Sequence, residues 1–249
     1  MALVWRKATR GKTYEVRQAG NSLRLYTDGT FHSQYNSKSS LSGGIWDLLV
    51  LPALFFPQQI KRVLVLGVGG GAVIRQLEHL LDPDKIVGVE LDPVHIAIAK
   101  KHFGLSGKKR VSLIRADAIE WLRQYRGKPF DLIIDDLFVE NSGDPHRAVV
   151  VNGEWSRVLL KNIAKGGGLA INFESSKALR SSALISEAAI NRKLSCGFAL
   201  SVPNYDNRIG AFFKQTVFKS DLSESLLNLE HRLGKSVTRR LAEKVRKLF

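Results

Sequence analysis

The stretch that decides the fold is VLVLGVGGGAV, Val63–Val73, in which an apolar run leads into a cluster of glycines. The run has no polar face, as expected for a parallel strand buried between two layers of helices. Residues 72–81 then have the spacing of a helix. Glycines at such a turn let the backbone approach a ligand closely and adopt positive φ angles. A strand, a glycine turn and a helix in this order predict a nucleotide-binding turn and leave open which nucleotide it binds.

The alternation of strand and helix continues after this turn. Repeated β-α-β units with right-handed crossovers build a doubly wound sheet. Residues 197–218 read as two strands around a turn, which predicts an antiparallel pair at one end of the sheet. We therefore predict an α/β fold with a mostly parallel, seven-stranded sheet. The remaining predicted strands lie at residues 62–67, 85–91, 110–117, 130–136 and 169–173.

The sequence before the sheet predicts a separate small lobe. Residues 12–34 alternate in polarity between turn signals, which is typical of a β-meander. We divide the chain into an N-terminal β-lobe with a gate loop (residues 1–44), a ligand-binding α/β domain (45–220) and a basic amphipathic C-terminal helix (221–249). That helix either packs its leucines on the domain or serves as a basic arm for an anionic partner.

The composition of the chain indicates where the protein is located and which classes of partner it can bind. Lys plus Arg number 38 against 23 Asp plus Glu, a formal net charge of +15 over 249 residues. Such a charge favours an anionic acceptor or partner, nucleic acid and acidic protein included, or it serves solubility alone. The single cysteine, Cys196, excludes an internal disulfide, and the start of the chain has no secretory apolar region, so we expect a cytoplasmic protein. The apolar stretch at 48–56 is too short to span a membrane.

Acidic residues end three successive predicted strands after the glycine turn. They are Glu90, followed by Leu91; Asp117, followed by Ala118; and the pair Asp135 and Asp136. Ligands of doubly wound sheets bind at the carboxyl ends of the strands, so these side chains converge on one edge. Taken singly, each acid also suits a helix N-cap or a loop role.

Each of these positions suits a different part of an adenosyl ligand. An acid after the second strand accepts hydrogen bonds from ribose hydroxyls. An acid after the third suits the adenine amino group, and one after the fourth faces the reacting end. Carboxylates suit a sulfonium cation better than a pyrophosphate, so we expect S-adenosylmethionine or its decarboxylated form. A nicotinamide or flavin dinucleotide is the weaker alternative.

Five stretches of the chain carry a resemblance to a known family. They are PQQIKRVLVLGVGGGAVIRQL, KIVGVELDPVHIAIAKKHF, RVSLIRADAIEWL, FDLIIDDLF and VPNYDNRIGAFF. Over residues 23–214 the chain resembles the spermidine synthase (polyamine aminopropyltransferase) family, within the class I methyltransferase superfamily with its Rossmann-like sheet. The resemblance implies that Glu90 binds ribose, that Asp117 binds the adenine edge and that Asp135 is the acid at the reacting centre.

The chain also departs from that family. The resemblance places Gly70 where the family has an aspartate that holds the amino end of the decarboxylated nucleoside and repels a carboxylate. The family's acidic stretch after the fourth strand reads Asp135-Asp136-Leu137-Phe138 here, so its second acid is missing. His32 stands for a family glutamine. A polyamine needs several carboxylates to compensate for its lost hydration, and these departures remove local acids.

Three functions follow from these observations. The leading expectation is methyl transfer from S-adenosylmethionine, with Asp135 or Asp136 orienting or deprotonating the acceptor. The alternatives are aminopropyl transfer from decarboxylated S-adenosylmethionine to an amine, and a non-catalytic nucleoside-binding scaffold with a basic docking surface. No metal site is expected, since one cysteine and unspaced histidines do not build one; a homodimer through the lobe is implied by the family. The expected cofactor-binding residues are Gly67, Gly69, Gly70, Gly71, Glu90, Leu91, Asp117, Ala118 and Asp135, and the expected substrate residues are His32, Tyr35, Trp46 and Tyr205.

Overall fold

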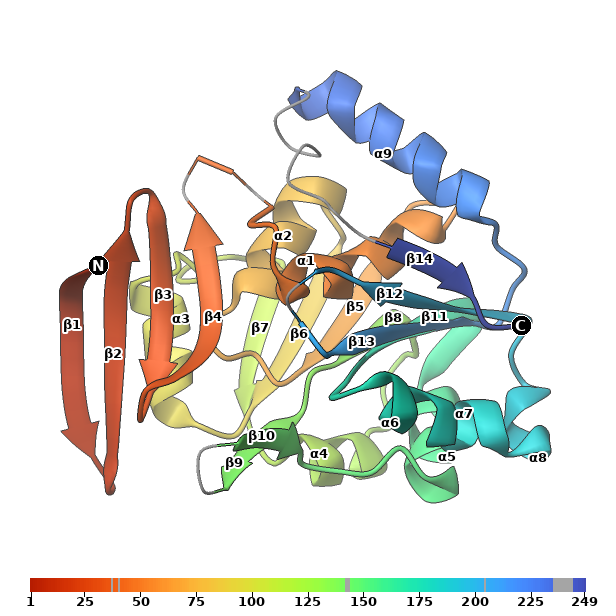
Figure 1. The fold of residues 1–249 in the computed structure, drawn as a ribbon, viewed down its shortest axis with the longest axis horizontal. Helices are drawn as coiled ribbons and strands as arrows, with labels where there is room; N and C mark the ends of the chain where they lie inside the picture. The colour runs from red at the N-terminus through yellow and green to blue at the C-terminus, as the bar shows by residue number, and fades with distance from the viewer. Residues whose placement is uncertain (37, 40, 142–143, 204, 235–243) are drawn as a thin grey trace.

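The central feature of the computed structural model is a twisted eight-stranded sheet with helices on both faces (Figure 1). The structure describes residues 1–36, 38–39, 41–141, 144–203, 205–234 and 244–249. The strand order is β14-β12-β13-β11-β8-β5-β6-β7, and the five strands from β11 to β7 are parallel. The strands are β5 (Arg62–Leu66), β6 (Lys85–Glu90), β7 (Val111–Arg115), β8 (Phe130–Asp135), β11 (Ile163–Phe173), β12 (Cys196–Ser201), β13 (Arg208–Phe213) and β14 (Lys244–Lys247).

Two apolar layers cover the two faces of this sheet. Alternate residues of β5 point to opposite sides: Val63 and Val65 join one buried cluster, Leu64 and Leu66 the other. The first cluster includes side chains from α1 (Ile45–Val50), the short helix at Leu51–Phe55, α2 (Ala72–Leu81) and α9 (Lys219–Leu233). The second includes side chains from α4 (Ala118–Gln124), α5 (Gly153–Lys161), α6 (Ser176–Ser181), α7 (Ala183–Ser186) and α8 (Ala188–Asn191).

The N-terminal lobe is an antiparallel four-stranded sheet beside the main domain (Figure 1). It packs through Tyr14, Val16 and Leu25 against α3 (Pro93–Lys101) and the fully buried Phe103. This contact brings its last strand over the turn between β5 and α2. The lobe's strands are β1 (Ala2–Thr9), β2 (Lys12–Ala19), β3 (Ser22–Thr27) and β4 (Thr30–Asn36).

Three details correct the sequence-based expectations. The sheet has eight strands instead of seven, because Lys244–Lys247 pair with the edge of β12 as β14. The prediction of a helix is therefore wrong at this segment, where Val245 packs on the core; it holds for α9, and residues 235–243 lie outside the described part. A hairpin of β9 (Phe138–Asn141) and β10 (Asp144–Arg147) was not predicted.

None of the helices in the described ranges is both long and apolar enough to cross a membrane.

The main sheet has two chemically different rims. We call the rim formed by the ends of β5, β6, β7, β8 and β11 the carboxyl edge, and the opposite rim, where these strands begin, the amino edge.

Candidate active site

The turn between β5 and α2, the glycine loop (residues 67–71), is shaped by three left-handed glycines. Gly67, Gly69 and Gly71 have φ angles of 82°, 53° and 86°. A Cβ atom on Gly67 would lie 2.4 Å from the carbonyl oxygen of Asp136. The loop therefore runs directly against the end of β8, where only glycine fits.

Gly70 is closed in by the lobe. A Cβ atom there would lie 2.9 Å from Ser33 Cβ and 3.0 Å from Phe103 Cζ. Phe103 is fully buried and Ser33 nearly so, which leaves no room for a larger residue without rearrangement. The aspartate that the resemblance assigns to this position in the family would therefore not fit here without rearrangement.

Glu90 ends β6 and holds the glycine loop. Its Oε2 accepts hydrogen bonds from the backbone N–H groups of Val68 and Gly69, both at 2.9 Å, and its Oε1 accepts one from Asp92 at 2.9 Å. A carboxylate offers about four acceptor positions, so about one is left for a ligand hydroxyl. Leu91 beside it is 63% exposed, which suits the face of a planar base.

Asp117 is the N-cap of α4. Its Oδ1 accepts from the backbone N–H groups of Ile119 and Glu120 at 2.8 and 3.1 Å. The residue is exposed, and its Oδ2 has no hydrogen bond to any other described residue, so it is available to a ligand amino group. Ala118 is buried beneath it.

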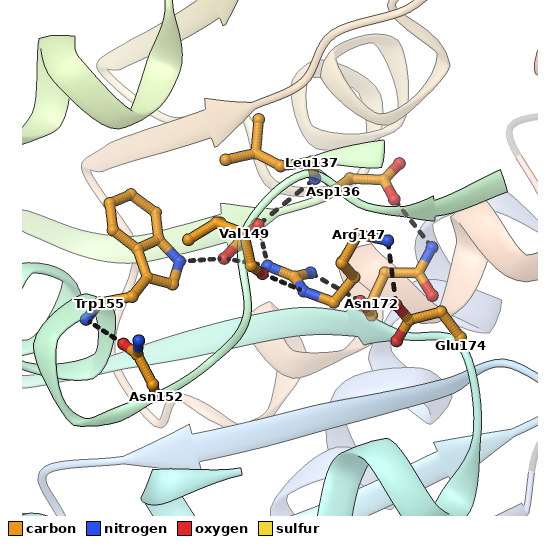
Figure 2. A network of polar contacts seen from close by, with 9 residues as sticks. Asp136, Leu137, Arg147, Val149, Asn152, Trp155, Asn172 and Glu174 are labelled. Carbon is orange, nitrogen blue, oxygen red and sulfur yellow. Dashed lines mark hydrogen bonds and ion pairs between the residues drawn. The ribbon is translucent and has the colours of Figure 1, made fainter. Parts of the chain in front are cut away.

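Asp135, the last residue of β8, lies in a buried ion pair. Its two carboxylate oxygens accept from the guanidinium of Arg147 at 2.9 and 2.8 Å, and Oδ2 also accepts from Trp155 Nε1 at 2.9 Å. Figure 2 labels the two donors, Arg147 and Trp155. Asp135 is fully buried and Arg147 is 8% exposed. A further Arg147 nitrogen donates to the carbonyl of Asn172 at 2.7 Å. All of these contacts commit Asp135 to protein groups and tie the β9–β10 hairpin to the sheet.

Asp136 points the other way along the carboxyl edge. It accepts a hydrogen bond from Asn172 Nδ2 at 2.8 Å, and Asn172 Oδ1 accepts one from Asn207 at 2.9 Å. Low solvation raises the pKa of Asp136 to about 6; Asp135 and Glu90 add to the rise, and the Asn172 hydrogen bond opposes it. A carboxyl with this pKa is suited to accept a proton near neutral pH.

Of the four expected substrate residues, the structure brings one to the glycine loop. The His32 carbonyl lies 3.3 Å from the Cβ position of Gly69, and its ring lies 5.0 Å from that of His95. Desolvation lowers the pKa of His32 to about 4, so the imidazole is neutral. Its Nε2 has no hydrogen-bond partner among the described residues.

The other three expected substrate residues have structural contacts. Tyr35 accepts a hydrogen bond from Arg75 at 2.9 Å, on the α2 side. Trp46 is 8% exposed and packs edge-on against Phe31 in the core. Tyr205 is half-buried and packs against the same core cluster.

Sequence reasoning did not single out Arg147, Trp155 or Asn172. The sequence of the hairpin that carries Arg147 has no pattern that predicts Asp135 as the partner of this arginine. Asn172 did leave a signal, because it is a polar residue near the carboxyl end of the apolar strand β11. Within the described residues, no group of three or more His, Cys, Asp or Glu side chains is placed to hold a metal ion.

The sheet, its glycine turn and the acids at its carboxyl edge define a class, the Rossmann-like α/β domains with a ligand edge at a strand-order reversal. Within that class, the chain belongs to the spermine/spermidine synthase domain family, whose model matches residues 47–214.

Known relatives refine this assignment. Over 137 residues the chain is 34% identical to polyamine aminopropyltransferase 2 of Caldanaerobacter subterraneus subsp. tengcongensis. The match covers 54% of this chain and 44% of that protein, so the chain spans less than half of the relative's length. These names favour the alternative of aminopropyl transfer. They do not support methyl transfer, which is the leading expectation from the sequence.

Solved structures show the same fold. A probable spermidine synthase from Corynebacterium glutamicum superposes with a TM-score of 0.76 at 17% identity, covering 99% of this chain and 91% of that one. Human methyltransferase-like protein 13 in complex with SAH superposes with a TM-score of 0.59 at 20% identity, covering 78% of this chain and 90% of that one. The small N-terminal sheet and the large, mostly parallel sheet together form the methyltransferase-like fold of spermidine synthases.

Proposed function

We propose that this protein transfers the aminopropyl group of decarboxylated S-adenosylmethionine to an amine acceptor at the carboxyl edge. The observation that carries the proposal is Asp136, a carboxyl with a pKa of about 6 beside the glycine loop of a chain in the spermine/spermidine synthase family. The family match supports the donor class, and the side chains below support the roles.

The residues of the carboxyl edge suit an adenosyl sulfonium donor. Asp117 Oδ2 is available to an amino group, and the remaining acceptor position of Glu90 is available to a ribose hydroxyl. Exposed Leu91 offers an apolar surface to the base. The sulfonium makes the adjacent carbon electrophilic and leaves as a neutral thioether.

Asp136 is the group that we assign to the acceptor. The amine nitrogen forms a bond to the aminopropyl carbon as the carbon–sulfur bond breaks, and the electron pair of that bond goes to sulfur. The amine attacks as the free base, so its proton must be removed, and Asp136 Oδ accepts it. Its pKa of about 6 predicts that kcat/KM falls about tenfold for each pH unit below 6.

The surrounding residues hold Asp136 in place. Asn172 donates to its carboxylate and Asn207 orients Asn172. Asp135 follows from the same strand end, but its carboxylate is occupied by Arg147 and Trp155. We therefore assign Asp135 a positioning role, in place of the direct catalytic and donor-binding roles that the sequence predicts for it.

One observation favours methyl transfer as a second candidate. The resemblance gives the family an acid at position 70 that excludes the donor carboxylate, and the structure offers no space for a side chain there. A donor that keeps its carboxylate is then not repelled at this position.

The test is the identity of the nucleoside released from each donor. The purified protein is incubated with decarboxylated S-adenosylmethionine or with S-adenosylmethionine, each with a panel of short amines. The proposal predicts amine-dependent release of 5′-methylthioadenosine from the decarboxylated donor. Release of S-adenosylhomocysteine instead would establish the second candidate, and no turnover of either donor would indicate a binding scaffold.

A further inference from the structure

The amino edge of the sheet carries a row of cations. Seven neighbouring strands, from β12 to β7, each have a lysine or arginine at or within three residues of the end that lies on this edge. The topology therefore collects positive charge on the rim opposite the candidate active site. In sheet order the residues are Lys193, Lys214, Lys161 with Lys165, Lys128, Lys61 with Arg62, Lys85, and Lys108 with Lys109 and Arg110.

Part of this row is neutralised within the protein. Arg110 pairs with Asp82, and Lys108 lies 3.5 Å from Glu78. Lys85 donates to Ser112 at 2.5 Å. Three of the four cations at the β6 and β7 end therefore have local partners, and the fourth, Lys109, is exposed.

At the other end of the row, among the described residues, only Lys214 and Arg62 donate side-chain hydrogen bonds to other residues. Five lysines there are exposed and make no side-chain hydrogen bond or ion pair to another described residue. Asp131, the acid on β8, accepts hydrogen bonds from the backbone N–H groups of Lys61 and Arg62, so it is committed to the backbone. The five are Lys61, Lys128, Lys161, Lys165 and Lys193.

A depression of about 400 Å³ lies at this end of the row. It is lined by Arg157, Leu160, Lys161, Lys193 and Lys214, of which four are cations; one of them, Arg157, forms an ion pair with Glu187 at 3.8 Å. Lys214 has a structural role, because its Nζ donates to the carbonyls of Leu160 and Ile163 at 2.8 and 2.9 Å, near the end of α5. Lys161 and Lys193 have no such role.

Helix dipoles explain only some of these cations. Cations near a helix C-terminus are favourable, which accounts for Lys161 at the end of α5. Lys128, Lys165 and Lys193 lie outside the last turns of α4, α5 and α8, in connections or in an irregular part of β11. Folding alone therefore gives no reason for a continuous row.

We propose that the amino edge from β12 to β5 binds the phosphate backbone of a nucleic-acid strand, with the depression as its most positive part. Neighbouring strands lie about 4.8 Å apart, so the exposed lysines of β12, β11, β8 and β5 spread over about 20 Å. A compact anion meets one or two of these cations. A phosphate backbone carries a charge on every residue and meets several at once without any sequence preference.

The test compares two charge-matched variants by fluorescence anisotropy with a labelled single-stranded DNA of about 20 nucleotides. K161E/K193E removes two cations of the depression. K7E/K219E removes two exposed lysines of β1 and α9 and lowers the net charge equally. Salt is varied from about 50 to 200 mM.

The proposal predicts that K161E/K193E weakens binding about tenfold and lowers the salt slope of log K by about 1.4, two phosphate contacts at about 0.7 each. K7E/K219E should weaken binding less than about threefold. K161Q/K193Q, which adds no repulsion, should fall between them. All three variants are checked for a native circular dichroism spectrum.

Several outcomes would overturn the proposal. Equal weakening by both charge-reversed variants would mean that net charge alone attracts the strand. Absence of binding at about 50 mM salt would exclude the site. Displacement of the strand by tripolyphosphate at equal phosphate concentration would point to a compact anion, and equal competition by polyglutamate would point to an acidic protein.

Discussion

The two edges of the central sheet are built from the same strands and have opposite chemistry. The carboxyl edge carries carboxylates that are buried or bonded to the backbone, such as Asp135 and Glu90. The amino edge carries exposed lysines without ion pairs to other described residues, such as Lys128 and Lys165. Charges on the first edge are held in a fixed geometry, whereas those on the second remain solvated.

Burial separates two uses of charge in this protein. A carboxylate held in place by hydrogen bonds can bind one ligand group in one orientation. Solvated cations give a field that attracts anions but imposes no orientation. The carboxyl edge is therefore suited to chemistry and the amino edge to docking, and substitutions at the two edges should have different effects.

The largest effect is expected at Asp136. Replacing it with asparagine keeps the shape but removes the group that accepts the acceptor's proton. We expect kcat to fall about 10²- to 10⁴-fold in the methylthioadenosine-release assay, because general-base catalysis contributes about that much. Asp84→Asn, at an exposed acid near the amino edge, is the matched control and should keep full activity. Full activity of D136N would remove Asp136 from the mechanism.

Arg147→Met tests the buried pair. Asp135 would be left fully buried without its guanidinium, so we expect the free energy of unfolding to fall by about 3–5 kcal/mol in urea denaturation. Arg110→Met removes one partner of an exposed pair at the amino edge and should change stability little. The double variant D135L/R147M should recover part of the loss. A loss no larger than that of R110M would mean that the Asp135 pair contributes as little as an exposed one.

Much of the fold could be predicted from the sequence, since it depends on local pattern. The apolar run forms β5, the glycines form the turn that follows it, and the acids lie at or just after the ends of β6, β7 and β8, as expected. Strands β2, β3 and β4 of the lobe followed from alternation and turn residues, whereas β1 was not predicted. The C-terminal segment did not follow from the sequence, because four residues of Lys-Val-Arg-Lys have no distinguishing period, and pairing with β12 decides their structure.

The sequence predicts the edge of the sheet on which the candidate site lies, but not the contacts within that site. Asp135 and Asp136 are adjacent, and a strand turns adjacent side chains to opposite sides. The sequence could not say which of them meets Arg147, because that partner comes from the β9–β10 hairpin. Tyr35 and Trp46 are predicted at the ligand; in the structure Tyr35 is hydrogen-bonded to Arg75, and Trp46 packs against Phe31.

A smaller effect is expected on the pH dependence of stability, which tests the raised pKa of Asp136. Its pKa is raised from 3.8 to about 6 in the folded protein, so the folded state binds the proton more tightly than the unfolded state. Unfolding then takes less free energy as the pH rises from about 4 to 6. D136N should lack this decline. Parallel curves for the two proteins in urea denaturation across this window would show that the pKa of Asp136 is not raised in the folded protein.

The smallest effect is expected on the free energy of unfolding, for substitutions at the amino edge. Lys161→Gln with Lys193→Gln removes two exposed cations that have no ion pair to another described residue. The free energy of unfolding should change by no more than about 0.5 kcal/mol. A loss comparable to that of R147M would mean that these lysines stabilise the fold, and the contrast between the two edges would fail.

The carboxyl edge is proposed to hold a decarboxylated adenosyl sulfonium donor. Calorimetric titration of the purified protein with decarboxylated S-adenosylmethionine and, in parallel, with S-adenosylmethionine tests this proposal most directly. We predict that the decarboxylated donor binds at least as tightly as the parent compound. Binding of S-adenosylmethionine that is tenfold tighter, about 1.4 kcal/mol, would contradict the account and make methyl transfer the function of this site.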